Sequence, residues 1–303
     1  MSSGARALER YAPEAAGALD AVVTATWAVS AGRGFLDTVL AAAAQNADLL
    51  DLPPLAPSGP AATTGGAVVG AAPADAVPPA VLAFAAQCTL DVASVTADQR
   101  ALFLAAAGPA SGDLAAALWV VDLVPRTRAA LDALFGPGPW PGPTGGDADL
   151  WGALDRMIRV VPSLDALDPV TSELVRLRGA RQHDCRLCRS LRSRPALRAG
   201  ADDDTFAAID HHADSDLPPL ARAALAFTDA MIWTPGHIPV TTLGDLQATT
   251  TPAQQVELVL DVTRNALNKI AVGLGADAAH VEDGVEIYDV APDGSLVYGL
   301  DAD

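Results

Sequence analysis

One segment divides the chain into two helical parts. The run Gly136–Gly146 (Gly-Pro-Gly-Pro-Trp-Pro-Gly-Pro-Thr-Gly-Gly) consists almost entirely of proline and glycine. Proline lacks an amide donor and glycine loses much backbone freedom in a helix, so this run cannot be helical. It predicts a linker over residues 136–147, between an N-terminal helical region 1–135 and a second region 148–280.

Apolar residues recur every three or four positions on both sides of this linker, which indicates helices. We expect them near 5–31, 33–50, 79–92, 96–107, 112–135, 148–160, 169–182, 184–199, 203–212, 217–232, 240–248 and 252–274. Residues 51–78 are rich in proline, glycine and threonine and predict a loop. Residues 285–290 and 295–300 alternate apolar and polar around Ala291-Pro-Asp-Gly294, which predicts a β-hairpin within the tail 281–303. The expected fold class is all-α with a short C-terminal β-hairpin.

The charge balance argues against two kinds of partner. The chain has 37 acidic and 19 basic residues, a net charge of −18. Nucleic acids and anionic lipid surfaces both require a basic face, so neither is expected as a partner. We expect no segment to span a membrane, and the N-terminus lacks the apolar core of a signal peptide. A cytoplasmic protein is therefore predicted.

The cysteines are Cys88, Cys185 and Cys188. An odd number with one close pair is not typical of a secreted disulfide framework. The spacing of Cys185 and Cys188 allows the two sulfurs to meet, which favours a redox dithiol over an inert pair. A metal site is less favoured, because only His183 lies nearby as a further ligand. No metal or cofactor is therefore predicted, and Cys88 is expected to be a small core residue.

Positive charge is concentrated around the cysteine pair. Eight arginines lie from Arg176 to Arg198, a span in which Asp184 is the only acid. We expect Asp184 to cap a helix that begins with Cys185, and we expect the surrounding charge to lower the pKa of at least one thiol. Arg192 lies four residues after Cys188, so within a helix the two would share a face.

Glu173 is expected on an otherwise apolar helix face formed by Val170, Leu174, Leu177 and Ala180. A carboxylate on such a face needs a partner, and burial raises its pKa toward neutrality, which suits a general base. The alternative is an ion pair with Arg176, Arg178 or an arginine of the next helix.

This arrangement resembles the alkyl hydroperoxidase D / carboxymuconolactone decarboxylase superfamily. Its thiol-bearing members carry Glu, eleven residues, Cys-x-x-Cys, three residues and then His. Glu173, Cys185 and Cys188 match that spacing, and Arg192 stands where the family has histidine. The resemblance covers about residues 150–280 and implies the family's antiparallel helical bundle. Short matches between the two halves, such as Leu82-Ala-Phe84 with Leu225-Ala-Phe227, make region 1–135 a candidate degenerate repeat. Arginine cannot accept a proton at neutral pH. Arg192 is therefore expected to hold a thiolate, and His183 to take over the proton step.

The resemblance implies a thiol-dependent peroxidase or disulfide oxidoreductase that acts on a small hydroperoxide or disulfide and is restored by an external dithiol. We expect Cys188 to attack, as the sulfur nearer the interior and Arg192, and Cys185 to resolve from the exposed end. Glu173 would be the base. Two alternatives are a non-redox enzyme of the carboxymuconolactone decarboxylase type and a non-catalytic helical assembly protein that has lost the motif histidine. A homo-oligomer, favoured as a dimer, is also implied.

Overall fold

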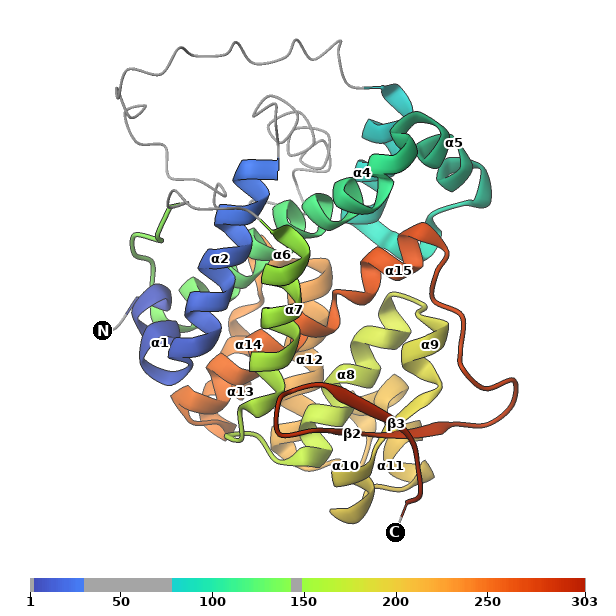
Figure 1. Ribbon diagram of the computed structural model, residues 1–303. Coiled ribbons are helices and arrows are strands. Elements are labelled where there is room, and N and C mark those ends of the chain that lie inside the picture. Colours follow the sequence, from blue (N-terminus) through green and yellow to red (C-terminus); the bar gives the residue numbers. More distant parts are fainter. Residues whose placement is uncertain (1–2, 30–77, 143–148, 303) are drawn as a thin grey trace.

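The computed structural model describes residues 3–29, 78–142 and 149–302 (Figure 1). The expected helix 33–50 and nearly all of the expected loop 51–78 lie outside this part of the chain. The helices are α1 (Gly4–Tyr11), α2 (Pro13–Val29), α4 (Pro79–Asp91), α5 (Ala97–Ala107), α6 (Ser111–Phe135), α7 (Leu150–Val160), α8 (Pro169–Gln182), α9 (Arg186–Arg189), α10 (Arg194–Arg198), α11 (Asp203–Ala207), α12 (Pro219–Trp233), α13 (Val240–Thr249), α14 (Pro252–Asn265) and α15 (Asn268–Leu274). Short 3-10 turns are η3 (Val92–Ser94), η4 (Gly108–Ala110), η5 (Val161–Ser163), η6 (Ala208–Asp214) and η7 (Pro235–His237).

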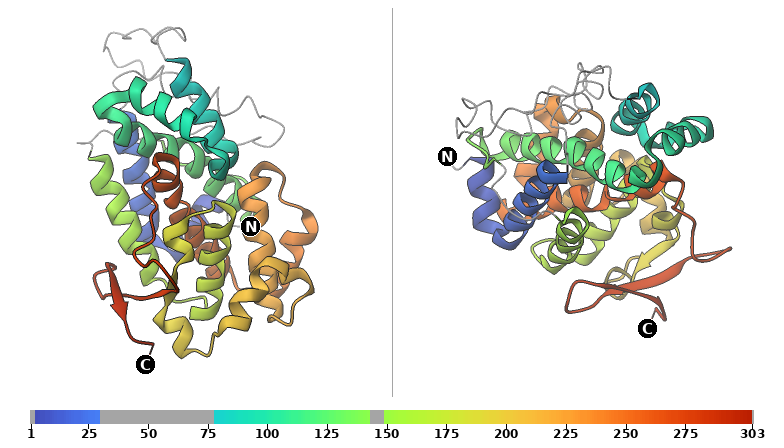
Figure 2. Two further views of the ribbon diagram at one scale, coloured as in Figure 1. Left: turned by 90° about the vertical axis from the view of Figure 1, so that its right-hand side faces the viewer. Right: turned by 45° about the horizontal axis from the view of Figure 1, so that its top comes forward.

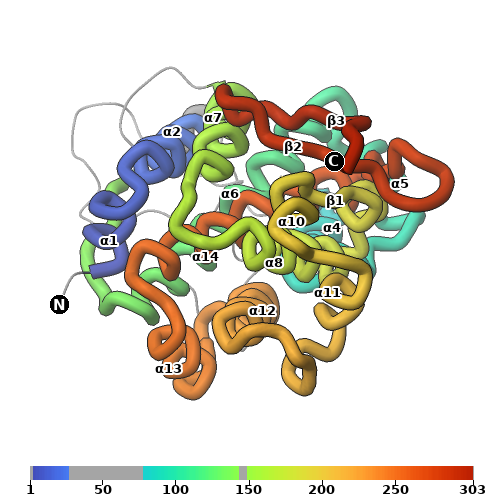
Figure 3. The backbone as a smooth tube through the Cα atoms, turned by 90° about the horizontal axis from the view of Figure 1, so that it is seen from below, coloured from blue at the N-terminus to red at the C-terminus, as the bar shows by residue number. Residues whose placement is uncertain are grey.

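A single large hydrophobic core combines helices from both sides of the proline- and glycine-rich segment. It contains apolar residues of α1, α2, α4 and α6 together with residues of α7, α12 and α14. α2 packs against α7, and α1 packs against both α6 and α14. Seen from below, α8 lies between α14 and α12 (Figure 3). A second, smaller cluster, which includes Leu174, Phe206 and Leu225, fills the space between α8, α11 and α12.

The expected helix 5–31 is two helices, because α2 begins at Pro13. Proline has no amide donor for a continuing helix but fits a first helical turn. The expected helix 252–274 also ends early, at Asn265, and α15 begins at Asn268 after a short turn.

The prediction of one continuous helix over residues 184–199 is wrong. These residues form α9, the strand β1 (Leu191–Ser193) and α10. Pro195 lies in the first turn of α10, where the Ser193 side chain accepts a hydrogen bond from the Ala196 amide at 3.4 Å. A new helix start at this point prevents α9 from continuing.

The strands β2 (Glu286–Val290) and β3 (Leu296–Leu300) pair antiparallel, which confirms the predicted hairpin. β1 adds a third strand, parallel to β2, that the sequence pattern did not predict. The protein is therefore mostly helical with one small three-stranded sheet. The hairpin and α5 lie at opposite ends of the molecule (Figure 2).

The turn of the hairpin is fixed by Gly294. Its φ is +78°, and its amide donates to the carbonyl of Ala291 at 2.8 Å. A Cβ atom at this position would lie 2.1 Å from the carbonyl oxygen of Arg159, at the end of α7. Glycine thus permits both the left-handed backbone and the close approach to α7.

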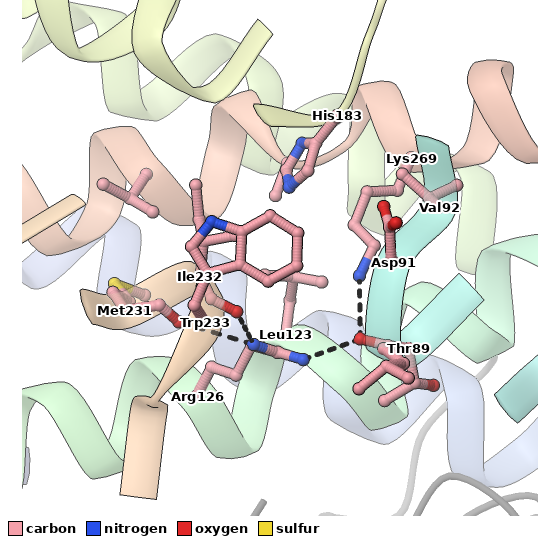
Figure 4. Close-up of a pocket in the computed structure, with 13 residues that line it drawn as sticks. Thr89, Asp91, Val92, Leu123, Arg126, His183, Met231, Ile232, Trp233 and Lys269 are labelled. Atoms are coloured by element: carbon pink, nitrogen blue, oxygen red, sulfur yellow. Dashed lines mark hydrogen bonds between the residues drawn. The ribbon is translucent and has the colours of Figure 1, made fainter. Parts of the chain in front are cut away.

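A buried ion cluster connects α6 to its neighbours. Asp122 forms ion pairs with Arg126, at 2.6 Å, and with Lys269. Arg126 also donates to the carbonyl of Thr89, at 2.8 Å, and to that of Ile232 (Figure 4). The guanidinium therefore satisfies backbone carbonyls near the ends of α4 and α12, where no amide of the helix can reach them.

Within the described residues, one helical run, Ala97–Phe135, is long and apolar enough to cross a membrane by length and composition. This differs from the expectation that no segment would qualify. One such run is weak evidence for a membrane span, because a core helix of a soluble protein meets the same test. The run also carries Asp122 and Arg126, whose side chains are buried against other helices.

Candidate functional site: the Cys185–Cys188 loop

The cysteine loop begins where α8 ends. Asp184 has a φ of +51°, a left-handed conformation that aspartate tolerates better than most residues. Asp184 is therefore not the helix cap that the sequence predicted. Cys185 takes that position, and its Sγ accepts a hydrogen bond from the Cys188 amide at 3.3 Å. The Asp184 carboxylate pairs with Arg189 at 2.5 Å instead.

The two sulfurs of the pair lie 2.7 Å apart, with the Cys185 thiol donating to Cys188. Both cysteines are free thiols. Cys185 is buried, with 1% of its surface exposed, whereas Cys188 is half-buried. The predicted order of burial is therefore wrong. Cys185 lies inside because its amide donates to the carbonyl of Ala180, which holds it against the last turn of α8.

The two thiols differ in acidity. The hydrogen bond from Cys185, the positive charge of Arg176 and a hydrogen bond from Asn268 together lower the pKa of Cys188 to about 7, although burial opposes them. The same bond to Cys188 and burial raise the pKa of Cys185. The arrangement therefore favours ionisation of Cys188 before Cys185.

Glu173 lies on the buried side of α8 and forms an ion pair with Arg176. The two Arg176–Glu173 hydrogen bonds measure 2.6 and 2.7 Å. The carboxylate also accepts the Ser193 amide and the Tyr288 hydroxyl, each at 3.0 Å. Of the alternatives for Glu173, the ion pair with Arg176 is the arrangement present.

Arg176 links Glu173 to the cysteine loop. Beyond its bonds to Glu173, it donates to the carbonyl oxygens of Cys188 and Leu191, each at 2.8 Å. The guanidinium therefore fixes the backbone that follows the reactive sulfur, and Glu173 fixes the guanidinium.

His183 is buried, and its Nδ1 lies 2.8 Å from Oδ1 of Asn268. Burial and the charge of Lys269 lower the pKa of His183 to about 3, so the ring is neutral at physiological pH. The amide of Asn268 in turn binds Cys188. His183 is thus joined to the thiol through Asn268, a residue of α15 that no sequence spacing indicated.

His183 also lines a small cavity of about 10 Å³ together with Arg126, Lys269 and Trp233 (Figure 4). This is about the room needed by one water molecule. The cavity is too small for a substrate. The buried ion cluster of Asp122, Arg126 and Lys269 therefore has a structural role and not a binding role.

Arg192 does not lie beside the thiols on a helix face as expected, because it belongs to strand β1. Its Nη1 donates to the carbonyls of Arg189 and Leu191, each at 2.8 Å. Its guanidinium lies 5.0 Å from the ring centroid of Phe206. The sequence prediction of a shared face fails because helical spacing does not hold across a strand.

Most of the other arginines near the pair bind carboxylates. Arg186 pairs with Asp277 at 2.7 Å, and Arg178 pairs with Asp229 at 2.7 Å. The local excess of positive charge is therefore smaller than the sequence suggested. Arg176 is the arginine that lowers the pKa of Cys188, and Asp277 acts in the opposite direction.

Asp277 holds the start of α9. Its carboxylate accepts the amide of Arg186 at 2.9 Å, and its backbone carbonyl accepts the amide of Leu187 at 2.9 Å. In residues 3–29, 78–142 and 149–302 no group of three or more His, Cys, Asp or Glu side chains is arranged to hold a metal ion.

The fold and the site define a mostly helical protein with a cysteine pair held between α8 and α15. The chain is 43% identical over 239 residues to a protein of Mycobacterium tuberculosis strain H37Rv named "Uncharacterized protein Rv2313c", with 75% of this chain and 82% of that protein covered. "Uncharacterized protein MT2376" of strain CDC 1551 matches with the same identity and coverage. No model of a known protein family matches the chain, and no solved structure matches it. The chain belongs to the family of these mycobacterial proteins.

Proposed function

We propose that the chain is a thiol-dependent peroxidase or disulfide oxidoreductase. The observation that carries the proposal is the geometry of the pair: the two sulfurs lie 2.7 Å apart, Cys185 is buried and Cys188 is half-buried, and Arg176 donates to the backbone carbonyl of Cys188. The hydrogen bond from Cys185 and the charge of Arg176 lower the pKa of Cys188. A thiolate is the nucleophilic form of cysteine, and a second thiol within reach allows a disulfide to form.

In the proposed reaction, the Cys188 thiolate attacks the terminal oxygen of a hydroperoxide. A sulfur–oxygen bond forms and the oxygen–oxygen bond breaks, so the sulfur is oxidised by two electrons to a sulfenic acid. The departing alkoxide takes the proton of Cys185 and leaves as an alcohol. The Cys185 thiolate then attacks the Cys188 sulfur, forms the disulfide and expels hydroxide, which solvent protonates to water. An external dithiol reduces the disulfide by exchange.

The surrounding residues support the Cys188 thiolate. Arg176 supplies positive charge and Asn268 a hydrogen bond. Glu173 is a positioning residue in this scheme because it holds Arg176, and its role as base stays a prediction. His183 holds the Asn268 amide, and its role in the proton step stays a prediction. Arg192 has no part in this scheme, because it belongs to β1 and its guanidinium faces Phe206. The cycle requires a reducing compartment, so the proposal includes a cytoplasmic location. It also includes a homo-oligomer.

Two observations favour the alternative of a non-catalytic helical assembly protein. The Glu173 carboxylate is occupied by four hydrogen bonds, and Arg192 is turned toward Phe206. In that case the natural chain should have no peroxidase activity. The non-redox decarboxylase alternative also stays open, and it predicts that no disulfide forms under peroxide.

The test uses the full chain with Cys88→Ser, so that only the pair can react. After treatment with substoichiometric cumene hydroperoxide, peptide mass spectrometry should find the Cys185–Cys188 disulfide. With Cys185→Ser added, a sulfenic-acid trap such as dimedone should label Cys188. With Cys188→Ser in its place, Cys185 should stay unlabelled. Absence of both the disulfide and the label would refute the proposal.

A further inference from the structure

A cavity of about 490 Å³ lies between α8, α14 and the C-terminal hairpin. Its lining includes apolar side chains, among them Val161, Leu164 and Val290, and two charged residues of α14, Asp261 and Arg264. Neither Cys185 nor Cys188 lines the cavity, although Glu173 and Arg176, which hold the cysteine loop, do. Its volume lies in the range of small-molecule pockets, which combine apolar walls with a few placed polar groups.

Arg264 is a cation without a carboxylate partner. Its Nε donates to the carbonyl of Ile158 at 3.0 Å, and its Nη1 lies 3.5 Å from Oδ1 of Asn265. Among the residues that the structure describes, no carboxylate oxygen lies within 4.0 Å of this guanidinium. Arg176, which lines the same cavity, is instead fully paired with Glu173.

Apart from the exposed Asp165, the acids that line the cavity have partners of their own, with one exception. Glu173 is held by Arg176 and Tyr288, and Asp289 is paired with Arg194.

Glu257 accepts the amide of Ala166 at 2.6 Å, and Asp165 is exposed at the rim. None of these acids neutralises Arg264 at close range.

The exception is Asp261, whose Oδ2 is buried and has no hydrogen-bond partner. Burial and the nearby Glu257 raise its pKa to about 7, although Arg264 and a hydrogen bond from Ser172 act against this. Near neutral pH the carboxyl readily takes up a proton. A protonated Asp261 leaves the charge of Arg264 uncompensated in the wall of the cavity.

We propose that this cavity binds a small carboxylic acid as its carboxylate, with Arg264 as the counter-ion and the apolar body of the ligand against Val161, Leu164 and Val290. A guanidinium offers parallel N–H donors that match the two oxygens of a carboxylate. Binding of the anion favours the protonated form of Asp261, so the site takes up a proton as it fills. This site goes beyond the proposed thiol chemistry and does not depend on it.

The experiment uses the full chain with Cys188→Ser, in which the proposed thiol reaction is absent. Saturation-transfer-difference NMR measures binding of acetate, butyrate and benzoate, with butylammonium and benzylammonium as cations of similar shape. At least one carboxylate should bind, and more tightly than its ammonium counterpart. Its affinity should fall by about tenfold from pH 6 to pH 8, because the protonated fraction of Asp261 falls by about that factor.

Three variants assign the site. Arg264→Gln should weaken the carboxylate by at least about tenfold, as expected for loss of a charged partner. Asp261→Asn should retain binding but remove the pH dependence. This second variant keeps the proposal testable if Arg264→Gln folds poorly. Arg156→Gln, at an exposed arginine of α7, is the matched control and should change nothing. The proposal is overturned if none of the three carboxylates binds, if the ammonium ions bind as well, or if Asp261→Asn leaves the pH dependence intact.

Discussion

Arg176 binds both carboxylate oxygens of Glu173, at 2.6 and 2.7 Å, and it also donates to the backbone carbonyl of Cys188. A single guanidinium thus connects the acid of the motif to the loop that carries the reactive sulfur. The hairpin joins the same network, since Tyr288 donates to Glu173 at 3.0 Å.

Replacing Arg176 should affect both stability and acidity. Arg176→Met leaves the Glu173 carboxylate buried without its cation, which costs about 3–5 kcal/mol in the free energy of unfolding. It also raises the pKa of Cys188 toward its ordinary value of 9.0, because a nearby positive charge is lost. Urea unfolding and pH-dependent alkylation measure the two effects.

The double variant Glu173→Gln/Arg176→Met separates these effects. It should recover part of the stability, since no buried charge is left unpaired, while the pKa of Cys188 stays high. A double variant with the natural pKa would contradict the assignment of Arg176 as the cation that supports the thiolate.

Asn268→Ala should also raise the pKa of Cys188, because the amide that binds the sulfur is removed. The expected readout is slower alkylation of Cys188 at pH 7 with an unchanged rate at pH 10, where the thiol is ionised in both proteins. Asn265→Ala, at the last residue of α14, serves as the control and should leave the profile unchanged. Equal effects from both substitutions would point to a general disturbance of the junction between α14 and α15.

His183 should make the fold sensitive to acid. Its pKa is lowered from 6.5 to about 3 in the folded state. Between these values the unfolded chain binds one more proton than the folded chain, so stability falls as the pH falls. The contribution approaches about 1.4 kcal/mol per pH unit. Urea unfolding from pH 6.5 to pH 4 should show a shallower loss of stability for His183→Gln than for the natural chain.

Gly294→Ala should undock the hairpin. The substitution places Cβ against the Arg159 carbonyl at a backbone φ of +78°. Gly284→Ala is the matched control, because its φ of +82° carries the same strain with open space around the added atom. The Gly294 variant should lose about 1–3 kcal/mol more than the control, with faster amide exchange in β2. Equal losses would mean that the turn is not packed on α7.

Local patterns predicted most of the fold. Apolar spacing predicted the helix 169–182, and α8 has the same bounds, Pro169–Gln182. The Asp168 side chain caps its start by accepting the Thr171 amide at 2.9 Å. The alternating pattern of 285–300 predicted the hairpin. Strand β1 escaped prediction because three residues carry no period, and their strand form depends on pairing with β2.

The site was predicted less completely than the fold. Spacing brought Cys185 and Cys188 together, and the ion pair of Glu173 with Arg176 was one of the alternatives. The predicted order of burial of the two cysteines and the predicted position of Arg192 were wrong, because both predictions assumed one continuous helix from 184 to 199. Asn268 and Asp277 could not be found, since they reach the loop through tertiary contacts from distant parts of the chain.

The most direct test is the titration of each thiol by itself. The Cys88→Ser chain is alkylated with iodoacetamide from pH 5 to pH 10, and the labelling rate of each cysteine is measured by peptide mass spectrometry. Cys88 itself has its pKa raised to about 12 by burial, so the background substitution removes little reactivity. Cys188 should show a midpoint of about 7, and Cys185 should stay unreactive at pH values well above it. A midpoint near 9 for Cys188, or faster labelling of Cys185, would contradict the account.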